Sequence, residues 1–228
     1  MTTEIVLPSF DPRHVPVVGV DGHLPKVQAH ALQPQALAQR FKHPPIWVPE
    51  LKGEPRFSDR KPVHASVLVP LVLHDRGLTV LLTERTTHLS SHSGQIAFPG
   101  GKADPEDSSA TDTALREAEE EIGLDRHYVE VLGSLPIYTT GSAFIVTPVV
   151  ALVSADYAMT LNPHEVADAF EVPLDFLMDP ANHRRHAVEW AGSRREWFSM
   201  PYNDTSQERF IWGATAGMLR NLYRFLLD

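Results

Sequence analysis

The amino-acid sequence predicts an α/β fold in which helices cover a mixed β-sheet. Short apolar runs bounded by turn residues recur along the chain, which is typical of strands, and two or three segments repeat their apolar residues at helical spacing. Of the 228 residues, 43% are hydrophobic, which is enough for the core of one domain or two small ones.

The N-terminal part of the chain differs in composition from the rest. Ten of the 19 prolines lie in residues 1–62, and apolar residues recur at helical spacing only over residues 33–41. We therefore interpret residues 1–60 as an irregular N-terminal extension with one short helix, and residues 61–228 as the main domain. Apolar residues such as Trp47 among these prolines favour two hypotheses. Either the extension covers one side of the sheet, or it forms a contact in a homodimer.

In the main domain, apolar runs that are typical of strands are separated by turn residues. In chain order, we expect strands at residues 65–73, 78–83, 129–136, 144–153, 188–190 and 196–200, and a closing amphipathic helix at residues 218–227. The first two strands form one hairpin around His74-Asp75-Arg76-Gly77, and the last two form another around Ala191-Gly192-Ser193.

Between these strands lies a segment that predicts a helix with two unlike faces. Ser109 with Asp112 resembles a capping box, and Gly123 suits the left-handed position after the last turn. At about 100° per residue, one side carries Glu117, Glu120 and Glu121, and the opposite side carries Ala114, Leu115, Ala118 and Ile122.

Glutamates at this spacing are typical of a site for a divalent cation. Carboxylates three and four positions apart on a helix lie roughly 5–6 Å from one another, and they repel. In a cleft, Mg²⁺ or Mn²⁺ would relieve this repulsion, because these ions prefer oxygen ligands. A solvated acidic helix face is the alternative. The helix caps, the position of Arg116 near Asp107 and Glu120, and the tight Gly100-Gly101 turn before the helix favour the metal site.

The segment from Gly101 to Leu124 resembles the Nudix box of the Nudix hydrolases. The matching positions are Gly101, Arg116, Glu117, Ala118, Glu120, Glu121, Gly123 and Leu124. Asp107 stands where the family has Glu, and eight residues instead of seven separate it from Arg116, so the role of Asp107 stays open. The resemblance implies an α-β-α sandwich and metal-dependent hydrolysis of a phosphoanhydride in a nucleoside diphosphate derivative.

Such a reaction assigns roles to the charged residues. Mg²⁺ or Mn²⁺ neutralises phosphate charge and supplies hydroxide near neutral pH, but a base must still take or orient the proton of the water. We expect Glu117, Glu120 and Glu121 to hold the metal, and Arg116, Glu117, Glu120 and Glu165 to form the catalytic group. Glu120 and Glu165 are the two candidates for the base. A helix-capping or surface role is the alternative for Glu165, which follows Asn162-Pro163.

Residues 81–101, just before and into the box, resemble the additional signature of the coenzyme A pyrophosphatase branch of that family. Members of that branch often carry the same extra residue and an Asp in the box. Further stretches that resemble it are residues 138–141, 144–150, 165–166, 170–174 and 211–216. The resemblance implies cleavage of coenzyme A, or of a derivative, into adenosine 3′,5′-bisphosphate and 4′-phosphopantetheine.

Two cations are candidates for binding the phosphates of the substrate. Arg85 is the first, because a guanidinium presents a fork of donors matched to phosphate, and Lys102 is the second. Each is otherwise an ordinary surface cation. His88 and His92 have the spacing of a zinc pair or of substrate contacts, and Trp190, Trp197 and Trp212 either stack on adenine or pack in the core.

Composition excludes several classes of function. The chain has 20 basic and 29 acidic residues, a net charge of −9, and no basic block interleaved with aromatics, which disfavours nucleic-acid binding. With no Cys, it has no disulfide and no thiolate nucleophile. No stretch approaches the roughly 18 apolar residues of a membrane span, so we expect a cytoplasmic protein that acts on a small nucleotide.

Two other functions remain compatible with the sequence. The same chemistry suits ADP-ribose, a nucleotide sugar, a dinucleotide or a nucleoside triphosphate, because the box specifies the diphosphate and not the attached group. A non-catalytic Nudix-like domain that senses a nucleotide is the third reading. Such a domain has no need of its metal ligands, whereas all three glutamates are present here.

Overall fold

The structure is a computed structural model that describes residues 11–227, except residues 57, 59, 87–93 and 191–192. The helices are α1 (Pro34–Lys42), α2 (Ala110–Ile122), α3 (Leu174–Leu177) and α4 (Gly213–Leu227), with short 3₁₀ helices η1 (Pro12–His14), η2 (Ala29–Leu32), η3 (Arg126–Tyr128) and η4 (Pro180–Asn182). The strands are β1 (Val17–Val20), β2 (Val63–His74), β3 (Gly77–Arg85), β4 (Ile96–Ala97), β5 (Gly100–Lys102), β6 (Val129–Ser134), β7 (Tyr138–Thr139), β8 (Phe144–Ser154), β9 (Val166–Pro173), β10 (Arg184–Trp190), β11 (Ser193–Asn203) and β12 (Glu208–Trp212). Within the described ranges, no helix is long and apolar enough to cross a membrane.

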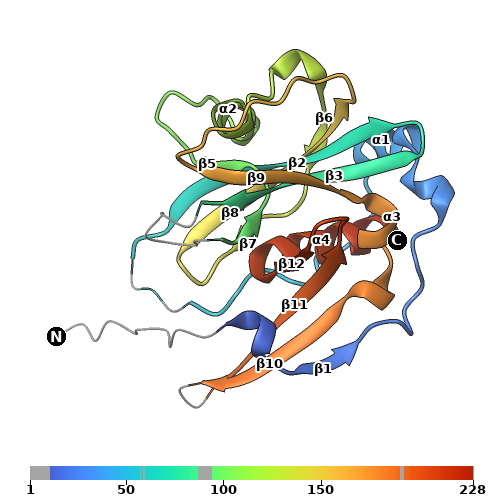
Figure 1. The fold of residues 1–228 in the computed structure, drawn as a ribbon, viewed down its shortest axis with the longest axis vertical. Coiled ribbons are helices and arrows are strands. Elements are labelled where there is room, and N and C mark those ends of the chain that lie inside the picture. The colour runs from blue at the N-terminus through green and yellow to red at the C-terminus, as the bar shows by residue number, and fades with distance from the viewer. Residues whose placement is uncertain (1–10, 57, 59, 87–93, 191–192, 228) are drawn as a thin grey trace.

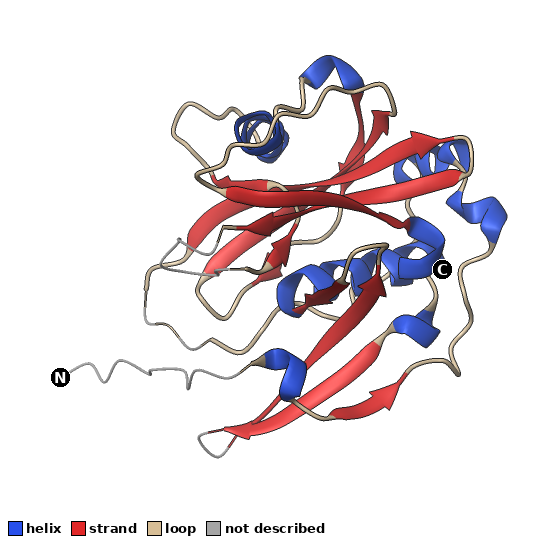
Figure 2. Cartoon of the chain, viewed as in Figure 1, coloured by secondary structure: helices blue, strands red, loops and turns tan. Residues whose placement is uncertain are grey.

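The larger sheet is mixed, as the sequence predicts. Its eight strands follow the order β4-β3-β2-β8-β6, and β5 pairs with β2, β7 with β8, and β9 with β3. β2 and β8 run parallel, from Val63 opposite Phe144 to Leu73 opposite Ser154, whereas the neighbouring pairs are antiparallel. Figures 1 and 2 show α2 over one face of this sheet and α4 under the other. The predicted α-β-α sandwich is therefore confirmed.

A second, antiparallel sheet of four strands lies on the far side of α4, in the order β1-β10-β11-β12 (Figure 1). α4 is buried between the two sheets, and most of its residues, polar ones included, are inaccessible to solvent. Leu219 and Leu222 are fully buried in one core with Met200 of β11 and Ile211 of β12. A separate core joins α2 to the opposite face of the larger sheet.

Several sequence predictions need correction. The hairpin predicted at residues 188–190 and 196–200 is longer, because β10 begins at Arg184 and β11 extends to Asn203. The closing helix begins at Gly213 instead of residue 218, since its first turns consist of small residues without apolar periodicity. There, Gly217 lies so close to Tyr138 that an added Cβ would overlap the hydroxyl group of this side chain. Strands β1, β5, β7, β9 and β12 were not predicted, and Gly100-Gly101, which was expected to form a tight turn, belongs to β5 because its backbone pairs with β2.

The N-terminal residues pack along α4. The short helix predicted at residues 33–41 is confirmed as α1, whose Leu37 is fully buried in the core that contains α4. Asn221 of α4 donates to the backbone oxygen of Leu51 at 2.7 Å and accepts its N–H at 3.0 Å. The Tyr223 hydroxyl donates to the oxygen of Pro25 at 2.7 Å. β1 also adds an edge strand to the smaller sheet.

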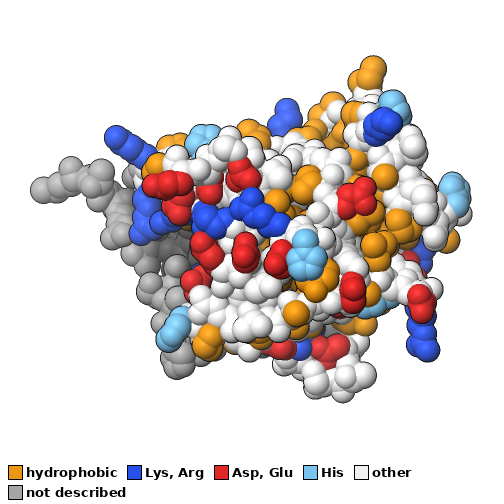
Figure 3. Space-filling view, turned by 90° about the horizontal axis from the view of Figure 1, so that it is seen from above, with side chains coloured by type: hydrophobic (Ala, Val, Ile, Leu, Met, Phe, Trp, Pro, Cys, Tyr) orange, Lys and Arg blue, Asp and Glu red, His pale blue; other side chains and the backbone are white. Residues whose placement is uncertain are grey.

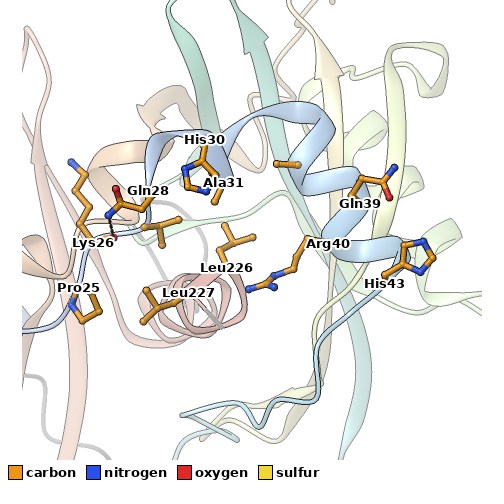
Figure 4. A pocket seen from close by; sticks show the side chains of 12 residues that line it. Pro25, Lys26, Gln28, His30, Ala31, Gln39, Arg40, His43, Leu226 and Leu227 are labelled. Carbon is orange, nitrogen blue, oxygen red and sulfur yellow. Dashed lines mark hydrogen bonds between the residues drawn. The ribbon is translucent and has the colours of Figure 1, made fainter.

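A cavity of about 680 Å³ lies where α1 passes the C-terminal end of α4 (Figure 4). Leu226 and Leu227 contribute apolar surface to it, and Lys26 and Arg40 contribute cations. Arg40 donates from Nε to the backbone oxygen of Phe225 at 3.0 Å. A cation in this position satisfies a carbonyl at the negative end of the helix. We therefore interpret Arg40 as a cap of α4.

The burial of His183 predicts that acid destabilises the folded state. It is fully buried, its Nε2–H donates to the Leu177 oxygen at 2.7 Å, and its Nδ1 accepts from Arg220 at 3.0 Å. Burial lowers the pKa of His183 from 6.5 to about 4, and the charge of Arg220 contributes. Between pH 6.5 and 4, His183 therefore binds a proton in the unfolded chain but stays neutral in the folded chain. Stability is expected to fall by roughly 3 kcal/mol from this group as the pH drops from 6.5 to 4.

Urea unfolding of the wild type and of His183→Gln between pH 7.5 and 5 measures this effect. Gln offers both a donor and an acceptor but does not titrate, so the variant should lose less stability over this range. Equal losses in the two proteins would show that His183 does not set the acid sensitivity.

Candidate active site

The caps that the sequence predicts for the glutamate helix are present in α2. Ser109 Oγ accepts the N–H of Asp112 at 3.1 Å, and Gly123 ends the helix with a left-handed φ of 68°. Ala118 and Ile122 on the predicted apolar side are fully buried against the larger sheet. The rotation of α2 about its axis is therefore fixed.

Two of the glutamates lie against the two glycines of β5. Glu121 is 3% exposed, and one of its oxygens accepts the N–H of Gly100 at 3.1 Å. An added Cβ at Gly101 would overlap the carboxylate of Glu117. Gly100 has a φ of 156°, and there a Cβ would overlap the backbone of β2. The Gly-Gly pair thus lets α2 approach the sheet at the point where its carboxylates lie.

Arg116 connects the carboxylates of α2 to the preceding loop. Its Nε and one terminal nitrogen donate to the two oxygens of Asp107, each at 3.0 Å. The other terminal nitrogen donates to Glu117 at 3.0 Å and to Glu120 at 3.1 Å. Figure 3 views this side of the molecule from above and shows Lys and Arg side chains flanked by Asp and Glu side chains. Arg116 therefore limits the rotation of both Glu117 and Glu120.

The structure gives Asp107 the role that the sequence left open. Besides the two bonds from Arg116, its carboxylate accepts the N–H of Asp104 at 2.9 Å and the hydroxyl of Thr113 at 2.8 Å. The hydrogen bond from Arg116 is the largest cause that holds the pKa of Asp107 well below its usual range. Asp107 is therefore an ionised anchor for Arg116 at neutral pH.

Arg85, at the end of β3, and Glu165, just before β9, lie near the carboxylate of Glu121 on α2. Arg85 ends β3, with a terminal nitrogen 3.6 Å from a Glu121 oxygen. Val166, the residue after Glu165, pairs with Arg85 across β9 and β3. The backbone oxygen of Glu165 accepts the N–H of Thr86 at 3.0 Å. Burial raises the pKa of Glu121 to about 7; Gly100 and Arg85 oppose this shift, while the charges of Glu117 and Glu165 add to it.

This arrangement fits a divalent cation. Burial raises the pKa of Glu117 as well, and the charges of Glu120 and Glu165 contribute although Arg116 opposes them. Within the described part of the chain, no three His, Asp or Glu side chains are already arranged as a metal site. The donors nevertheless are carboxylate oxygens that repel one another, and Mg²⁺ and Mn²⁺ prefer such ligands. A bound divalent cation would therefore offset a repulsion that the protein only partly relieves.

The other candidates contact this group only through the backbone, lie in the smaller sheet, or fall outside the described residues. The side chain of Lys102 is exposed, and its backbone oxygen accepts from Arg116 at 3.0 Å. Trp197 and Trp212 pack in the smaller sheet, with ring centroids 6.4 Å apart. His88, His92 and the side chain of Trp190 lie outside the part that the structure describes.

Sequence reasoning missed Asn162, which it treated only as a neighbour of Glu165. Asn162 Nδ2 donates to a Glu165 oxygen at 3.3 Å, and its Oδ1 accepts the N–H of His164 at 3.1 Å. The signal was present in the sequence, because Asn before Pro is typical of a side-chain-stabilised turn.

Comparison with known proteins identifies relatives of the chain. The family model described as the NUDIX domain matches residues 62–199. A protein of Yersinia enterocolitica named "Uncharacterized Nudix hydrolase NudL" is 43% identical over 159 residues, which cover 70% of this chain and 79% of that protein. Its namesake in Yersinia pestis is 41% identical over 158 residues, or 69% of this chain and 77% of that protein.

Solved structures with partial similarity include a C. elegans Ap4A hydrolase in a binary complex. That match has a TM-score of 0.43 and 18% identity, and it covers 49% of this chain and 80% of the other. The NUDIX domain of Shewanella oneidensis NrtR, solved with ADP-ribose, matches with a TM-score of 0.39 and 26% identity over 50% of this chain and 75% of that chain.

Proposed function

The chain belongs to the Nudix hydrolase family, and we propose that it hydrolyses the pyrophosphate of coenzyme A or of a coenzyme A derivative. The products are adenosine 3′,5′-bisphosphate and 4′-phosphopantetheine, or its acylated form. The observation that carries the chemistry is the convergence of Glu117 and Glu121 on the glycines of β5, with Arg85 beside Glu121. The resemblance of residues 81–101 to the coenzyme A pyrophosphatase signature supports this substrate.

In this proposal, Glu117, Glu120 and Glu121 hold Mg²⁺ or Mn²⁺. When bound, such an ion neutralises phosphate charge and makes hydroxide available near neutral pH. Arg116 keeps Glu117 and Glu120 in place, as its hydrogen bonds to both indicate. The oxygen of a water molecule attacks one phosphorus, and the bond from that phosphorus to the bridging oxygen breaks. The bridging oxygen leaves with the other phosphate.

The proton of the attacking water needs an acceptor, and Glu165 is our first candidate, with Glu120 as the alternative. Glu165 lies beside Arg85 at the edge of the sheet and raises the pKa values of Glu117 and Glu121, so its charge acts on the proposed metal ligands. Glu120 is already engaged by Arg116. Lys102 is a further candidate for contact with an outer phosphate.

Product analysis by mass spectrometry tests the substrate. The purified chain is incubated with Mg²⁺ or Mn²⁺ and with coenzyme A, ADP-ribose or a nucleoside triphosphate in parallel. We expect 4′-phosphopantetheine to form from coenzyme A faster than any product forms from the other two. Faster cleavage of ADP-ribose or of the triphosphate would support a Nudix hydrolase but reject coenzyme A as its substrate. No turnover of any of them would favour a nucleotide sensor.

Arg85→Lys is expected to raise the KM for coenzyme A by about tenfold and to change kcat much less. Lysine keeps the positive charge beside Glu121 but loses the fork that binds two phosphate oxygens, and hydrogen bonds to charged groups contribute about 1.5–3 kcal/mol. Arg76→Lys, an exposed change in the β2–β3 turn, is the control. An unchanged KM in Arg85→Lys would show that Arg85 does not bind a phosphate of the substrate through its guanidinium fork.

A further inference from the structure

We propose that Asn162 is a positioning residue that holds the carboxylate of Glu165 for proton transfer. This inference rests on the proposed function, in which Glu165 accepts the proton of the attacking water. Asn162 does not contact the reacting atoms in this proposal. It acts by fixing which oxygen of Glu165 is bound by the protein and which one faces the water.

The hydrogen bonds of Asn162 determine the orientation of its side-chain amide. Its Oδ1 accepts the N–H of His164 at 3.1 Å, which closes a turn of the kind that Asn favours. A nitrogen in the place of Oδ1 would meet that N–H donor to donor, so the amide has one favourable orientation. Nδ2 is therefore the atom directed at Glu165, and it lies 3.3 Å from Glu165 Oε1.

The backbone of Asn162 fixes this turn relative to the metal-binding helix. Its N–H donates to the backbone oxygen of Glu121, in the last turn of α2, at 2.9 Å. Its own oxygen accepts the N–H groups of Glu165 at 3.0 Å and of Val166 at 2.9 Å. One residue thus connects the backbone of a proposed metal ligand to the side chain of the proposed base.

A second contact holds the turn from the side of β3. Thr86 donates its N–H to the backbone oxygen of Glu165 at 3.0 Å and its hydroxyl to the backbone oxygen of His164 at 3.3 Å. Pro163 restricts the backbone between Asn162 and His164 further. The Cα of Glu165 is therefore fixed by the backbone, and the remaining freedom lies in its side chain. Asn162 Nδ2 restricts that freedom by binding Oε1, which leaves Oε2 to receive the proton.

The substitution Asn162→Asp tests this assignment. Aspartate keeps an oxygen that accepts from His164, so the turn remains, but an oxygen replaces the Nδ2 donor and repels Glu165. We expect kcat to fall by roughly 10- to 100-fold, a part of the 10²- to 10⁴-fold that a general base contributes, while KM changes less than about twofold. Asn203→Asp, an exposed change in β11, controls for the added charge. Thermal unfolding checks that each variant is folded.

A double-mutant cycle with Glu165→Gln separates this proposal from the one on which it rests. If Asn162 acts through Glu165, adding Asn162→Asp to Glu165→Gln lowers kcat no further. An impaired Glu165→Gln beside a fully active Asn162→Asp would overturn the role of Asn162 and keep the base. A fully active Glu165→Gln would overturn both. Should Asn162→Asp fold poorly, Asn162→Ser keeps an acceptor for His164 without added charge, and the same loss of kcat is expected.

Discussion

Glu120→Gln is expected to lower kcat by about 10³-fold or more, which is the loss of roughly 4 kcal/mol of transition-state stabilisation. The neutral amide is a much weaker ligand for Mg²⁺ than a carboxylate, and it does not accept a proton. The side chain of Glu120 is 56% exposed, and Arg116 is its ion-pair partner at 3.1 Å. Folding therefore depends little on its charge, and the loss should be confined to catalysis.

Glu119→Gln is the matched control for this prediction. Glu119 is the neighbouring residue on α2 and is also exposed, but at about 100° per residue it points away from Glu117, whereas Glu120 shares Arg116 with Glu117. The same change of charge at position 119 should leave kcat within about twofold of the wild type, since surface charges act weakly at a distance. If Glu120→Gln retained a tenth or more of the wild-type kcat, Glu120 would be neither an essential metal ligand nor the base.

The orientation of these glutamates was predictable because local rules determine it. The caps Ser109 and Gly123 and the buried residues Ala118 and Ile122 fix where α2 begins, ends and faces, and all four are readable from the sequence. The role of Asp107 was not readable in this way. The sequence suggested that Arg116 could reach Asp107, but the extra residue between them shifts the spacing, and the folded loop shows that the two side chains pair through two hydrogen bonds.

Contacts between distant parts of the chain explain the elements that were missed. β1 forms only by pairing with β10, about 170 residues further along, and four residues carry too little periodicity to predict a strand. The start of α4 was missed because Gly213 and Gly217 disfavour a helix locally. Close packing of Gly217 against Tyr138 outweighs that preference.

Arg220→Met is expected to lower the free energy of unfolding by about 3–5 kcal/mol, because it removes a buried cation that pairs with the buried carboxylate of Asp21 and with the partly exposed Glu50. Arg220 of α4 is 2% exposed. Its guanidinium lies 3.0 Å from Asp21, 2.8 Å from Glu50 and 3.0 Å from His183 Nδ1, and it covers the ring of Phe198. Asp21 and Glu50 belong to the N-terminal part of the chain, so this one side chain joins that part to the core helix.

Urea unfolding measures this loss, and Arg224→Met provides the comparison. Arg224 lies one turn further along α4, is 35% exposed and is 3.7 Å from Glu50. A partly exposed pair of this kind contributes about 0–1 kcal/mol, so its removal should be nearly neutral. Equal effects of the two substitutions would mean that burial of the Arg220 ion pairs adds nothing to stability.

The sign of a second substitution identifies the physical cause of the loss. In the wild type, Asp21→Asn removes an ionised partner of Arg220 and should destabilise the chain. In the Arg220→Met background, the carboxylate of Asp21 stays buried and retains Arg185 at 3.0 Å as its partner, so the neutral amide should cost much less or stabilise. If Asp21→Asn destabilised both proteins equally, the loss in Arg220→Met would come from packing against Phe198 and not from an unpaired charge. The N-terminal part of the chain would then be held to α4 mainly by apolar contacts such as those of Leu37.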